Sequence, residues 1–188
     1  MQKKIVILAS GGGSNAEKII DRLHSSSEID VLGVISNNRQ AGVFDRVKPY
    51  GVPCLWIDKK FYQSDQFLFL ISNLNPDLIV LAGFLWKIPK ALVQNFPQKI
   101  INIHPSLLPK YGGKGMYGAN VHQAVKESGD DFTGITIHYV NEFYDQGAII
   151  FQNQVKINAT DNVSTIAQKV QQLEHKYFPE VIEKILKN

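Results

Sequence analysis

The chain has 188 residues, 44% of them apolar, and a formal net charge of +3. This length predicts one domain over residues 1–188 with a single substantial core. The lysines are scattered, which argues against a nucleic-acid surface, and no apolar run is long enough to span a membrane. We therefore expect small-molecule partners, a cytoplasmic location, and a monomer or homodimer.

The only cysteine, Cys54, lies in the apolar run 53–57. A lone cysteine cannot form an internal disulfide, which is typical of a protein from a reducing compartment. Its apolar neighbours predict a buried thiol without a catalytic role. No set of Cys, His and Glu residues has the spacing of metal ligands, so no metal is expected.

The first half of the chain alternates short apolar runs with helical patterns. The predicted strands span 5–9, 31–36, 54–57 and 77–82. The predicted helices span 41–50, 65–74 and the segment in which Ala16, Ile19, Ile20 and Leu23 repeat at helical spacing. This alternation predicts an α/β fold, with a Rossmann-like, mostly parallel sheet and helices on both faces.

The pattern changes in the second half. A strand over 100–104 is followed by a glycine-rich stretch, 111–118, and by a helix near 120–128. The two next strands, 134–140 and 148–155, are separated by a short segment, 141–147. We therefore expect an antiparallel C-terminal strand pair.

A long amphipathic helix follows. Its apolar stripe consists of Val163, Ile166, Ala167, Val170, Leu173 and Tyr177. Thr160 or Asp161 is expected to cap its first turn, and Pro179 is expected to kink or break it. Glu174 interrupts the stripe, where a carboxylate is costly unless it has a partner.

The strand over 100–104 ends in polar side chains. Side chains alternate along a strand, so Asn102 and His104 point to the same face, roughly 7 Å apart. Pro105 then ends the ladder of backbone hydrogen bonds. An amide donor beside an imidazole suits the stabilisation of charge on a carbonyl oxygen, although satisfied polar residues at a strand end give the same pattern.

A glycine loop joins the first strand to the first helix. The backbone N–H groups of Gly13, Ser14 and Asn15 lie at the positive end of the predicted helix, which indicates a phosphate site. The loop also fits a loose dinucleotide fingerprint. A dinucleotide is disfavoured because Asn37 and Asn38, rather than a ribose-binding acid, follow the second strand. A simple tight turn is the other alternative.

Residues 102–111 read Asn-Ile-His-Pro-Ser-Leu-Leu-Pro-Lys-Tyr, and an aspartate follows in the turn 144–147. This combination resembles the motif of the folate-dependent formyltransferases, and the similarity covers nearly the whole chain. The resemblance implies transfer of a formyl group from 10-formyltetrahydrofolate, used as cosubstrate, to the amine of phosphoribosylglycinamide. That reaction belongs to de novo purine (IMP) biosynthesis.

The resemblance also implies roles for individual residues. Asn102 and His104 would stabilise the oxyanion of a tetrahedral intermediate. Asp145 matches the catalytic aspartate, which would orient His104 and relay the proton of the amine. Ser106 and His138 would have supporting roles. Without the resemblance, an aspartate before a glycine is an ordinary turn residue.

The resemblance divides the substrate contacts between two groups of residues. The expected ribotide contacts are Gly13, Ser14 and Asn15, which hold the phosphate, and Glu174. The expected contacts to the pterin and benzoyl rings are Phe84, Leu85, Trp86, Lys87 and Ile88, with Val140 and Asn141 opposite. Judged without the resemblance, the apolar run 81–88 fits a core equally well. Trp86 stands where the family commonly has an arginine, so we expect stacking rather than charge to hold the folate tail.

One stretch departs from the family. The interval from His104 to His122 is longer than in its commonest versions, so the glycine-rich residues 112–118 have no assigned contacts and are a candidate mobile lid. Gly118 and His122 are secondary candidates for the site.

Several other functions stay open. Methionyl-tRNA formyltransferase, sugar N-formyltransferases and formyltetrahydrofolate hydrolase share the motif, and a non-catalytic nucleotide- or folate-binding module is a different class. The chain length argues against an added tRNA-binding or preceding domain, and the phosphate loop favours a phosphorylated amine.

Overall fold

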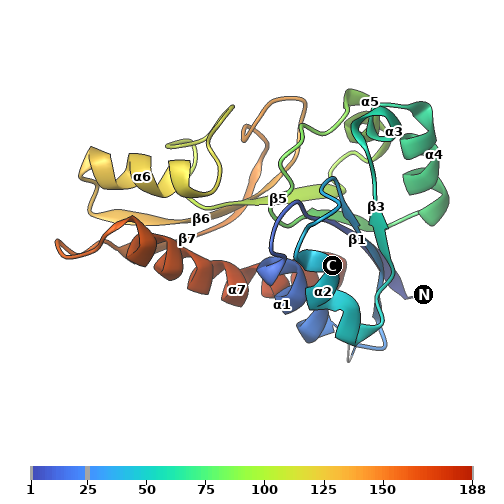
Figure 1. Ribbon diagram of the computed structural model, residues 1–188, viewed down its shortest axis with the longest axis horizontal. Coiled ribbons are helices and arrows are strands. Elements are labelled where there is room, and N and C mark those ends of the chain that lie inside the picture. The colour runs from blue at the N-terminus through green and yellow to red at the C-terminus, as the bar shows by residue number, and fades with distance from the viewer. Residues whose placement is uncertain (1, 24–25, 188) are drawn as a thin grey trace.

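The computed structural model describes residues 2–23 and 26–187. Its strands are β1 (Lys3–Leu8), β2 (Ile29–Ser36), β3 (Cys54–Trp56), β4 (Leu78–Leu81), β5 (Ile100–His104), β6 (Phe132–Tyr139) and β7 (Ile149–Lys156). They form one sheet in the order β3-β2-β1-β4-β5-β6-β7 (Figure 1). The first five strands are parallel, and β6 is antiparallel to both of its neighbours. The predicted α/β fold with an antiparallel C-terminal pair is confirmed.

Helices cover both faces of the sheet. They are α1 (Ser14–Leu23), α2 (Val43–Val47), the 3-10 turn η1 (Lys48–Tyr50), α3 (Lys59–Tyr62), α4 (Asp65–Leu74), α5 (Lys90–Asn95), α6 (Ala119–Ser128) and α7 (Val163–Lys187). The expected helix over 41–50 is thus a short helix followed by a 3-10 turn. The short helices α3 and α5 were not predicted, because one or two turns give too few apolar repeats to detect.

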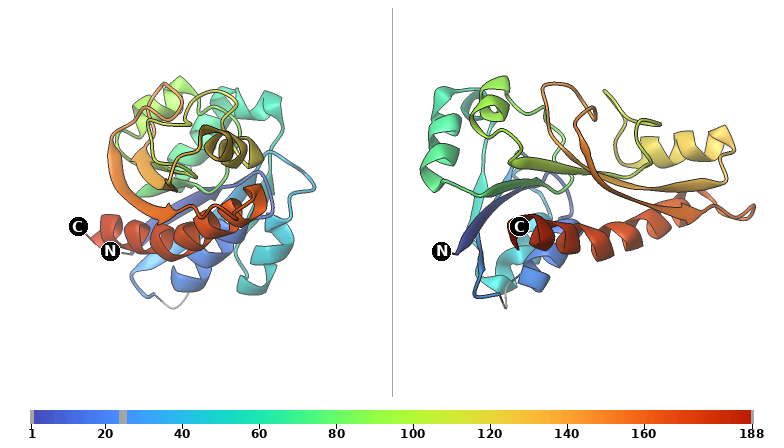
Figure 2. Two further views of the ribbon diagram at one scale, coloured as in Figure 1. Left: turned by 90° about the vertical axis from the view of Figure 1, so that its left-hand side faces the viewer. Right: turned by 180° about the vertical axis from the view of Figure 1, so that it is seen from behind.

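The alternation of β1 explains the two helical layers. Ile5 and Ile7 face the cluster formed with α1, α2 and α7, whereas Val6 and Leu8 face the cluster formed with α4 and α5. Figure 2 shows the long α7 along one face of the sheet. Within the described ranges, no helix is long and apolar enough to cross a membrane.

The direction of winding changes between β1 and β4. From β1 the chain first adds β2 and β3 on one side and then returns to add β4 and β5 on the other. In such sheets a crevice opens beyond the carboxyl ends of the two strands where the winding reverses. Here Ser10 N donates to Gly83 O at 3.1 Å across that point.

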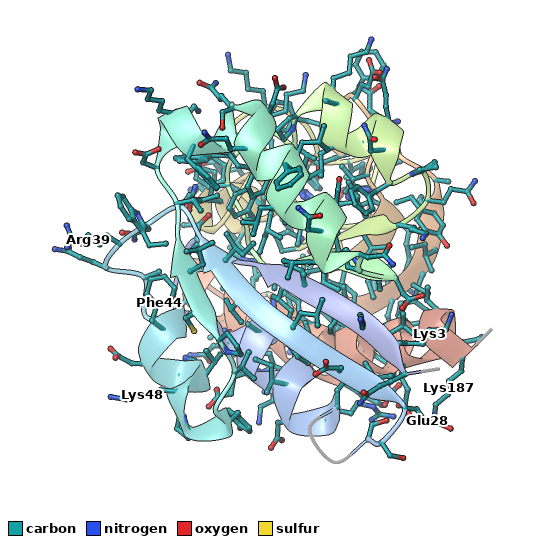
Figure 3. The ribbon with its side chains drawn as sticks, turned by 90° about the vertical axis from the view of Figure 1, so that its right-hand side faces the viewer. Lys3, Glu28, Arg39, Phe44, Lys48 and Lys187 are labelled. Carbon is teal, nitrogen blue, oxygen red and sulfur yellow. The ribbon has the colours of Figure 1, made fainter. Side chains whose placement is uncertain are left out.

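The other end of the sheet, where β1 and β2 begin, is charged. Lys3, Glu28 and Lys187 gather there, and Lys187 Nζ lies 3.7 Å from a Glu28 carboxylate oxygen (Figure 3). Arg39, which follows the carboxyl end of β2, lies well away from them in the same view.

The prediction of a buried thiol at Cys54 was wrong. Cys54 is exposed, as are Leu55 and Trp56, which retain 42% and 43% of their accessible surface. The reason is topological, because β3 is an edge strand of the sheet. An apolar run of this length does not distinguish an edge strand from a central one.

For α7 the expected cap was wrong, and of the kink or break expected at Pro179 the break was wrong. The cap is Asn162 rather than Thr160 or Asp161: Thr165 N donates to Asn162 Oδ1 at 2.9 Å, and Asn162 N donates to Thr165 Oγ1 at 2.8 Å. Pro179 does not break the helix, which continues to Lys187. Pro179 is buried beside Phe178, and packing of this half of α7 on the sheet holds the helix together despite the missing N–H donor.

Candidate active site

A cavity of about 530 Å³ opens where the carboxyl ends of β4 and β5 meet the β6–β7 loop and the loop before α6. The predicted site residues that line it are Asn15, Phe84, Leu85, Trp86, Lys87, Ile88, Asn102, His104, Gly118, His138, Val140, Asn141, Asp145 and Glu174. Four other candidates, Gly13, Ser14, Ser106 and His122, do not line it. Among the described residues, no group of three or more His, Cys, Asp or Glu side chains is arranged to hold a metal ion.

Asn102 is held by its cross-strand neighbour. The register of β5 and β6 places Asn102 opposite His138, and Asn102 Nδ2 lies 3.1 Å from His138 Nε2. His138 Nδ1 lies 2.9 Å from the Tyr139 carbonyl, which can only accept, so Nδ1 carries the proton. Burial lowers the pKa of His138. The neutral ring therefore accepts from the Asn102 amide, whose second N–H remains to serve the cavity.

His104 is oriented by a backbone carbonyl. Its Nε2 lies 2.8 Å from Tyr111 O, so Nε2 donates and carries the proton of the neutral ring. The other ring nitrogen, Nδ1, lies 3.6 Å from Asp145 Oδ1. That separation is too long for a hydrogen bond but within the range of an ion pair. Asp145 would therefore stabilise an imidazolium that forms there.

Asp145 lies at the centre of the polar cluster. Its Oδ1 is 3.6 Å from His104 Nδ1 and 3.7 Å from His138 Nε2, and its Oδ2 accepts from Gly113 N at 2.8 Å. Its backbone has a φ of +54°, an uncommon conformation for a residue with a side chain. The carboxylate is mostly buried and still reaches the cavity.

Ser106 stabilises the chain just after the end of β5. It is fully buried, and its Oγ donates to Lys110 O at 2.8 Å. Its carbonyl accepts from Thr136 Oγ1 at 2.7 Å, and that hydroxyl accepts from Leu108 N at 2.9 Å. These bonds satisfy the backbone after Pro105 and fix the path of the chain away from His104.

The glycine loop is braced from α2. Gly13 has a φ of +77°, and a Cβ there would lie 2.4 Å from Val43 Cγ2, so only glycine fits. Arg46 Nε donates to Gly12 O at 2.7 Å while its guanidinium pairs with Glu17 at 2.9 Å. The first N–H groups of α1 consequently face outward from a fixed loop, without partners in their own helix.

Glu174 and Asn15 meet at the edge of the cavity. Asn15 Nδ2 donates to Glu174 Oε2 at 3.1 Å, which gives the carboxylate of the α7 stripe its partner. Burial nevertheless raises the pKa of Glu174 to about 7. Asn15 Oδ1 is buried without a hydrogen-bond partner among the described residues. Both groups thus have unused hydrogen-bonding capacity toward a ligand.

The opposite wall is aromatic. Phe84 and Ile88 are buried in the core cluster, so this segment is partly core, whereas Leu85 keeps 50% of its surface exposed. Trp86 is half-buried against Tyr62, with ring centroids 5.0 Å apart. Val140 closes this wall from the end of β6, and the Asn141 side chain braces the following turn by donating to Gln146 O.

A second hollow of about 640 Å³ continues from this wall and shares Leu85 and Trp86 with the first cavity. It is rich in lysine: Lys59 Nζ lies 4.7 Å from the Trp86 ring centroid, and Lys87 Nζ lies 5.7 Å from that of Tyr144. Lys90 also lines it but pairs with Glu142 at 3.2 Å. The positive charge of Lys59 therefore lies beside Trp86, the position at which the resemblance led us to expect an arginine.

A model of the formyl transferase family matches residues 3–182. The chain belongs to this family. It is 41% identical over 188 residues to phosphoribosylglycinamide formyltransferase, chloroplastic, of Arabidopsis thaliana, an alignment that covers 96% of this chain and 64% of the plant protein. The chain thus spans less than two thirds of that relative.

Two further relatives are covered almost in full by this formyl transferase family member. The phosphoribosylglycinamide formyltransferase of Bacillus subtilis (strain 168) is 36% identical over 190 residues, with 98% of this chain and 95% of that protein aligned. The crystal structure of the protein of the same name from Anaplasma phagocytophilum superimposes with a TM-score of 0.90 at 30% identity, covering 100% of this chain and 88% of that one.

Three residues of the candidate site and its adjoining hollow were not predicted from the sequence. Tyr111 and Gly113 contact His104 and Asp145 through backbone groups, which no side-chain pattern can indicate. Lys59 belongs to α3, a helix too short to predict. The only signal for Lys59 was indirect: Trp86 stands where an arginine was expected, so the positive charge had to come from a basic residue elsewhere in the chain.

Proposed function

We propose that this chain transfers the formyl group of 10-formyltetrahydrofolate to the primary amine of phosphoribosylglycinamide. The amine nitrogen forms a bond to the formyl carbon, and the bond from that carbon to N10 of the folate breaks. One proton leaves the amine and one reaches N10, so the products are formylated ribotide and tetrahydrofolate. The names of the relatives support this assignment, and the cavity supplies each group that the reaction needs.

The observation that carries the proposal is the convergence of Asn102, His104 and Asp145 on one cavity. Asn102 has a free amide N–H, and His104, once protonated at Nδ1, donates a second hydrogen bond to the oxygen that becomes negative. Donors fixed before the reaction stabilise such an oxyanion at no cost of reorganisation. The Asn102–His138 and His104–Tyr111 hydrogen bonds support this preorganisation.

Asp145 is the proposed proton acceptor. Its Oδ1 faces His104 Nδ1 at 3.6 Å, and its Oδ2 is occupied by Gly113 N. A carboxylate in this position stabilises the His104 imidazolium and accepts the proton of the attacking amine, directly or through water. Asp145, now protonated, would then act as the acid, and its proton would pass through His104 or water to the leaving nitrogen.

The ribotide would bind at the glycine loop. The N–H groups at the start of α1, which follow Gly13, offer donors to the phosphate at the positive end of the helix. The unused capacity of Glu174 and Asn15 suits ribose hydroxyl groups. This arrangement favours a phosphorylated amine over an unphosphorylated one.

The folate would lie along the other wall. Leu85 and Val140 offer apolar surface to the pterin and benzoyl rings, and Trp86 offers a stacking surface. The adjoining hollow adds charge, because Lys59 and Lys87 are placed to pair with the carboxylates of the glutamate tail. We therefore extend the expectation of stacking alone to stacking combined with lysine pairing. The unpaired thiol of Cys54 is compatible with a cytoplasmic, reducing location for the reaction.

The test is to mix the purified protein with 10-formyltetrahydrofolate and follow the release of tetrahydrofolate with and without phosphoribosylglycinamide. Release that depends on the amine is the expected result. Release without the amine would indicate formyltetrahydrofolate hydrolysis instead. Binding of both ligands without release would indicate a non-catalytic module and overturn the proposal.

A further inference from the structure

Two residues near the cavity have a backbone conformation that side chains disfavour. Tyr111 has a φ of +57° and Asp145 a φ of +54°. In the described part of the chain, the other non-glycine residues with positive φ are Asn75, which ends α4, and Gln98. Such a conformation persists only where surrounding contacts hold it, and it clusters at functional sites.

The unusual conformation of Tyr111 accompanies a backbone contact to His104. Tyr111 O accepts from His104 Nε2 at 2.8 Å. Because a carbonyl cannot donate, this bond keeps the ring proton on Nε2 and leaves Nδ1 directed at Asp145. The direction of one peptide carbonyl thus determines which nitrogen of His104 faces the reacting groups.

The next two residues hold Asp145. Gly113 N donates to Asp145 Oδ2 at 2.8 Å, with a φ of +102° at Gly113. A Cβ on Gly112 would lie 3.2 Å from Asp145 Cβ and 2.6 Å from Leu108 Cδ2, so Gly112 permits the close approach of the two loops. Three consecutive residues therefore contact both members of the proposed His104–Asp145 pair.

The segment is anchored at its other end on the surface. The Tyr111 hydroxyl lies 2.6 Å from Ser128 Oγ and 2.8 Å from Asp130 Oδ2, both just beyond α6 or at its end. Lys110 Nζ pairs with the same Asp130 carboxylate at 2.9 Å. Hydrogen bonds from Lys110 and Tyr111 hold the pKa of Asp130 below its ordinary value, so the anchor is charged.

We propose that Tyr111, Gly112 and Gly113 form a positioning segment, which fixes the proton of His104 and the placement of Asp145 through the anchor at Asp130. The inference rests on the proposed function, since it names residues that act on the same reaction. The segment touches no reacting atom in this scheme. It acts by holding the backbone carbonyl of Tyr111 and the backbone N–H of Gly113 at fixed positions.

Other ionisable groups also lie near His104. They are Asp145 on the β6–β7 loop, His138 on β6 and His122 on α6. Burial and the nearby charge of His104 lower the pKa of His122. These groups remain in place in the variants below, so a change in which nitrogen of His104 carries the proton reports on the segment.

The first variant is Tyr111→Phe, which keeps the ring packed against the cluster of Val121, Val125 and Ile166 and removes the anchoring hydroxyl. We expect kcat to fall about tenfold, less than the ~10²-fold loss that a 1 Å misplacement can cause. The KM of both substrates should stay within twofold. The pH profile of kcat/KM should shift. The matched control is Tyr177→Phe, whose ring stacks on Phe151 outside the cavity and whose activity should not change.

The second variant is Gly113→Ala. A Cβ at Gly113 meets nothing within 4 Å, so the change imposes only backbone strain, as does Gly51→Ala outside the site. We expect kcat to fall about 10²-fold in Gly113→Ala and to stay unchanged in Gly51→Ala. Loss of thermal stability without a change in kcat or in the pH profile, in both Tyr111→Phe and Gly113→Ala, would overturn the proposal.

A measurement that needs no turnover separates this proposal from the proposed function. Nitrogen NMR of the histidine rings, assigned with His104→Gln, reports which nitrogen of His104 carries the proton. We expect the Nε2–H form to dominate in the wild type and to lose population in Tyr111→Phe. An unchanged ring in Tyr111→Phe would contradict the positioning role, whether or not the protein releases tetrahydrofolate.

Discussion

The two ends of the cavity are built differently. At the polar end, Asn102, His104 and Asp145 come from the β5–β6 pair and its loops, and buried hydrogen bonds fix them from several sides. At the other end, Leu85 and Tyr144 are exposed, and Phe143 at the tip of the β6–β7 loop keeps 64% of its surface exposed. The lysines of this end, Lys59 and Lys87, are exposed and lie over aromatic rings.

This difference indicates a division of labour. Groups that stabilise developing charge must be fixed beforehand and shielded from water, where each donor has a large effect. Groups that hold an extended ligand add small increments over a wide surface, and water screens their charges. We therefore expect changes at the polar end to lower kcat and changes at the exposed end to raise KM.

Asp145→Asn tests the polar end most severely. The amide oxygen can still accept from Gly113 N, so the loop should keep its place, but the side chain can no longer take a proton. We expect kcat to fall by about 10³-fold or more while binding of both substrates changes less than threefold. Steady-state kinetics and calorimetric titration with the ribotide measure the two effects. Turnover near the wild-type rate would refute the assigned role.

Asn102→Ala should have the next largest effect. It removes the proposed donor to the oxyanion and also the amide that binds His138 Nε2. We expect kcat to fall ~10²- to 10³-fold with little change in either KM. If kcat falls less than fivefold, Asn102 does not serve the oxyanion and is a structural partner of His138.

Glu174→Gln tests the ribotide side of the cavity through pH. The carboxylate titrates near 4.5 when unfolded and at about 7 when folded, so the folded protein retains a proton that the unfolded chain releases between these values. Stability is therefore lost as the pH rises from 4.5 through 7. Between pH 5 and pH 8 the wild type should lose about 1–3 kcal/mol of unfolding free energy through this group, and Glu174→Gln should not.

Denaturant titrations at pH 5 and pH 8 measure this loss, and Glu180→Gln on the same helix, which lies near Arg22, controls for the change of net charge. The KM for the ribotide should rise in Glu174→Gln and not in Glu180→Gln. Equal pH dependence of stability in wild type and Glu174→Gln would show that the Glu174 carboxyl ionises normally in the folded protein.

The sequence predicted which residues of a strand share a face, but not where each strand lies in the sheet. The alternation of β5 was sufficient to place Asn102 and His104 on one face, because the period of a strand leaves no other choice. The alternation of strands and helices was sufficient for the α/β fold. The burial of Cys54 was mispredicted because the position of a strand within a sheet depends on long-range topology.

The remaining features depend on contacts that side-chain patterns do not encode. Tyr111 and Gly113 act through a carbonyl and an N–H, which every residue possesses. Lys59 reaches Trp86 from a helix of one turn, and the place of that helix depends on the whole fold. Asn162 caps α7 although Thr160 and Asp161 are also residue types that favour this position, and only the path of the chain decides among them.

The exposed end is tested by Lys59→Ala and Lys87→Ala, with Lys60→Ala on the same short helix as the control, since Lys60 does not line the hollow. We expect the KM for 10-formyltetrahydrofolate to rise about two- to fivefold in each of the first two variants, with kcat unchanged, because exposed ion pairs contribute little. The increase should shrink as salt is added. With a formyl donor truncated before its glutamate tail, wild type and variants should have the same KM. A fall in kcat with the truncated donor would mean that these lysines act on the polar end, and the two ends would then not be independent.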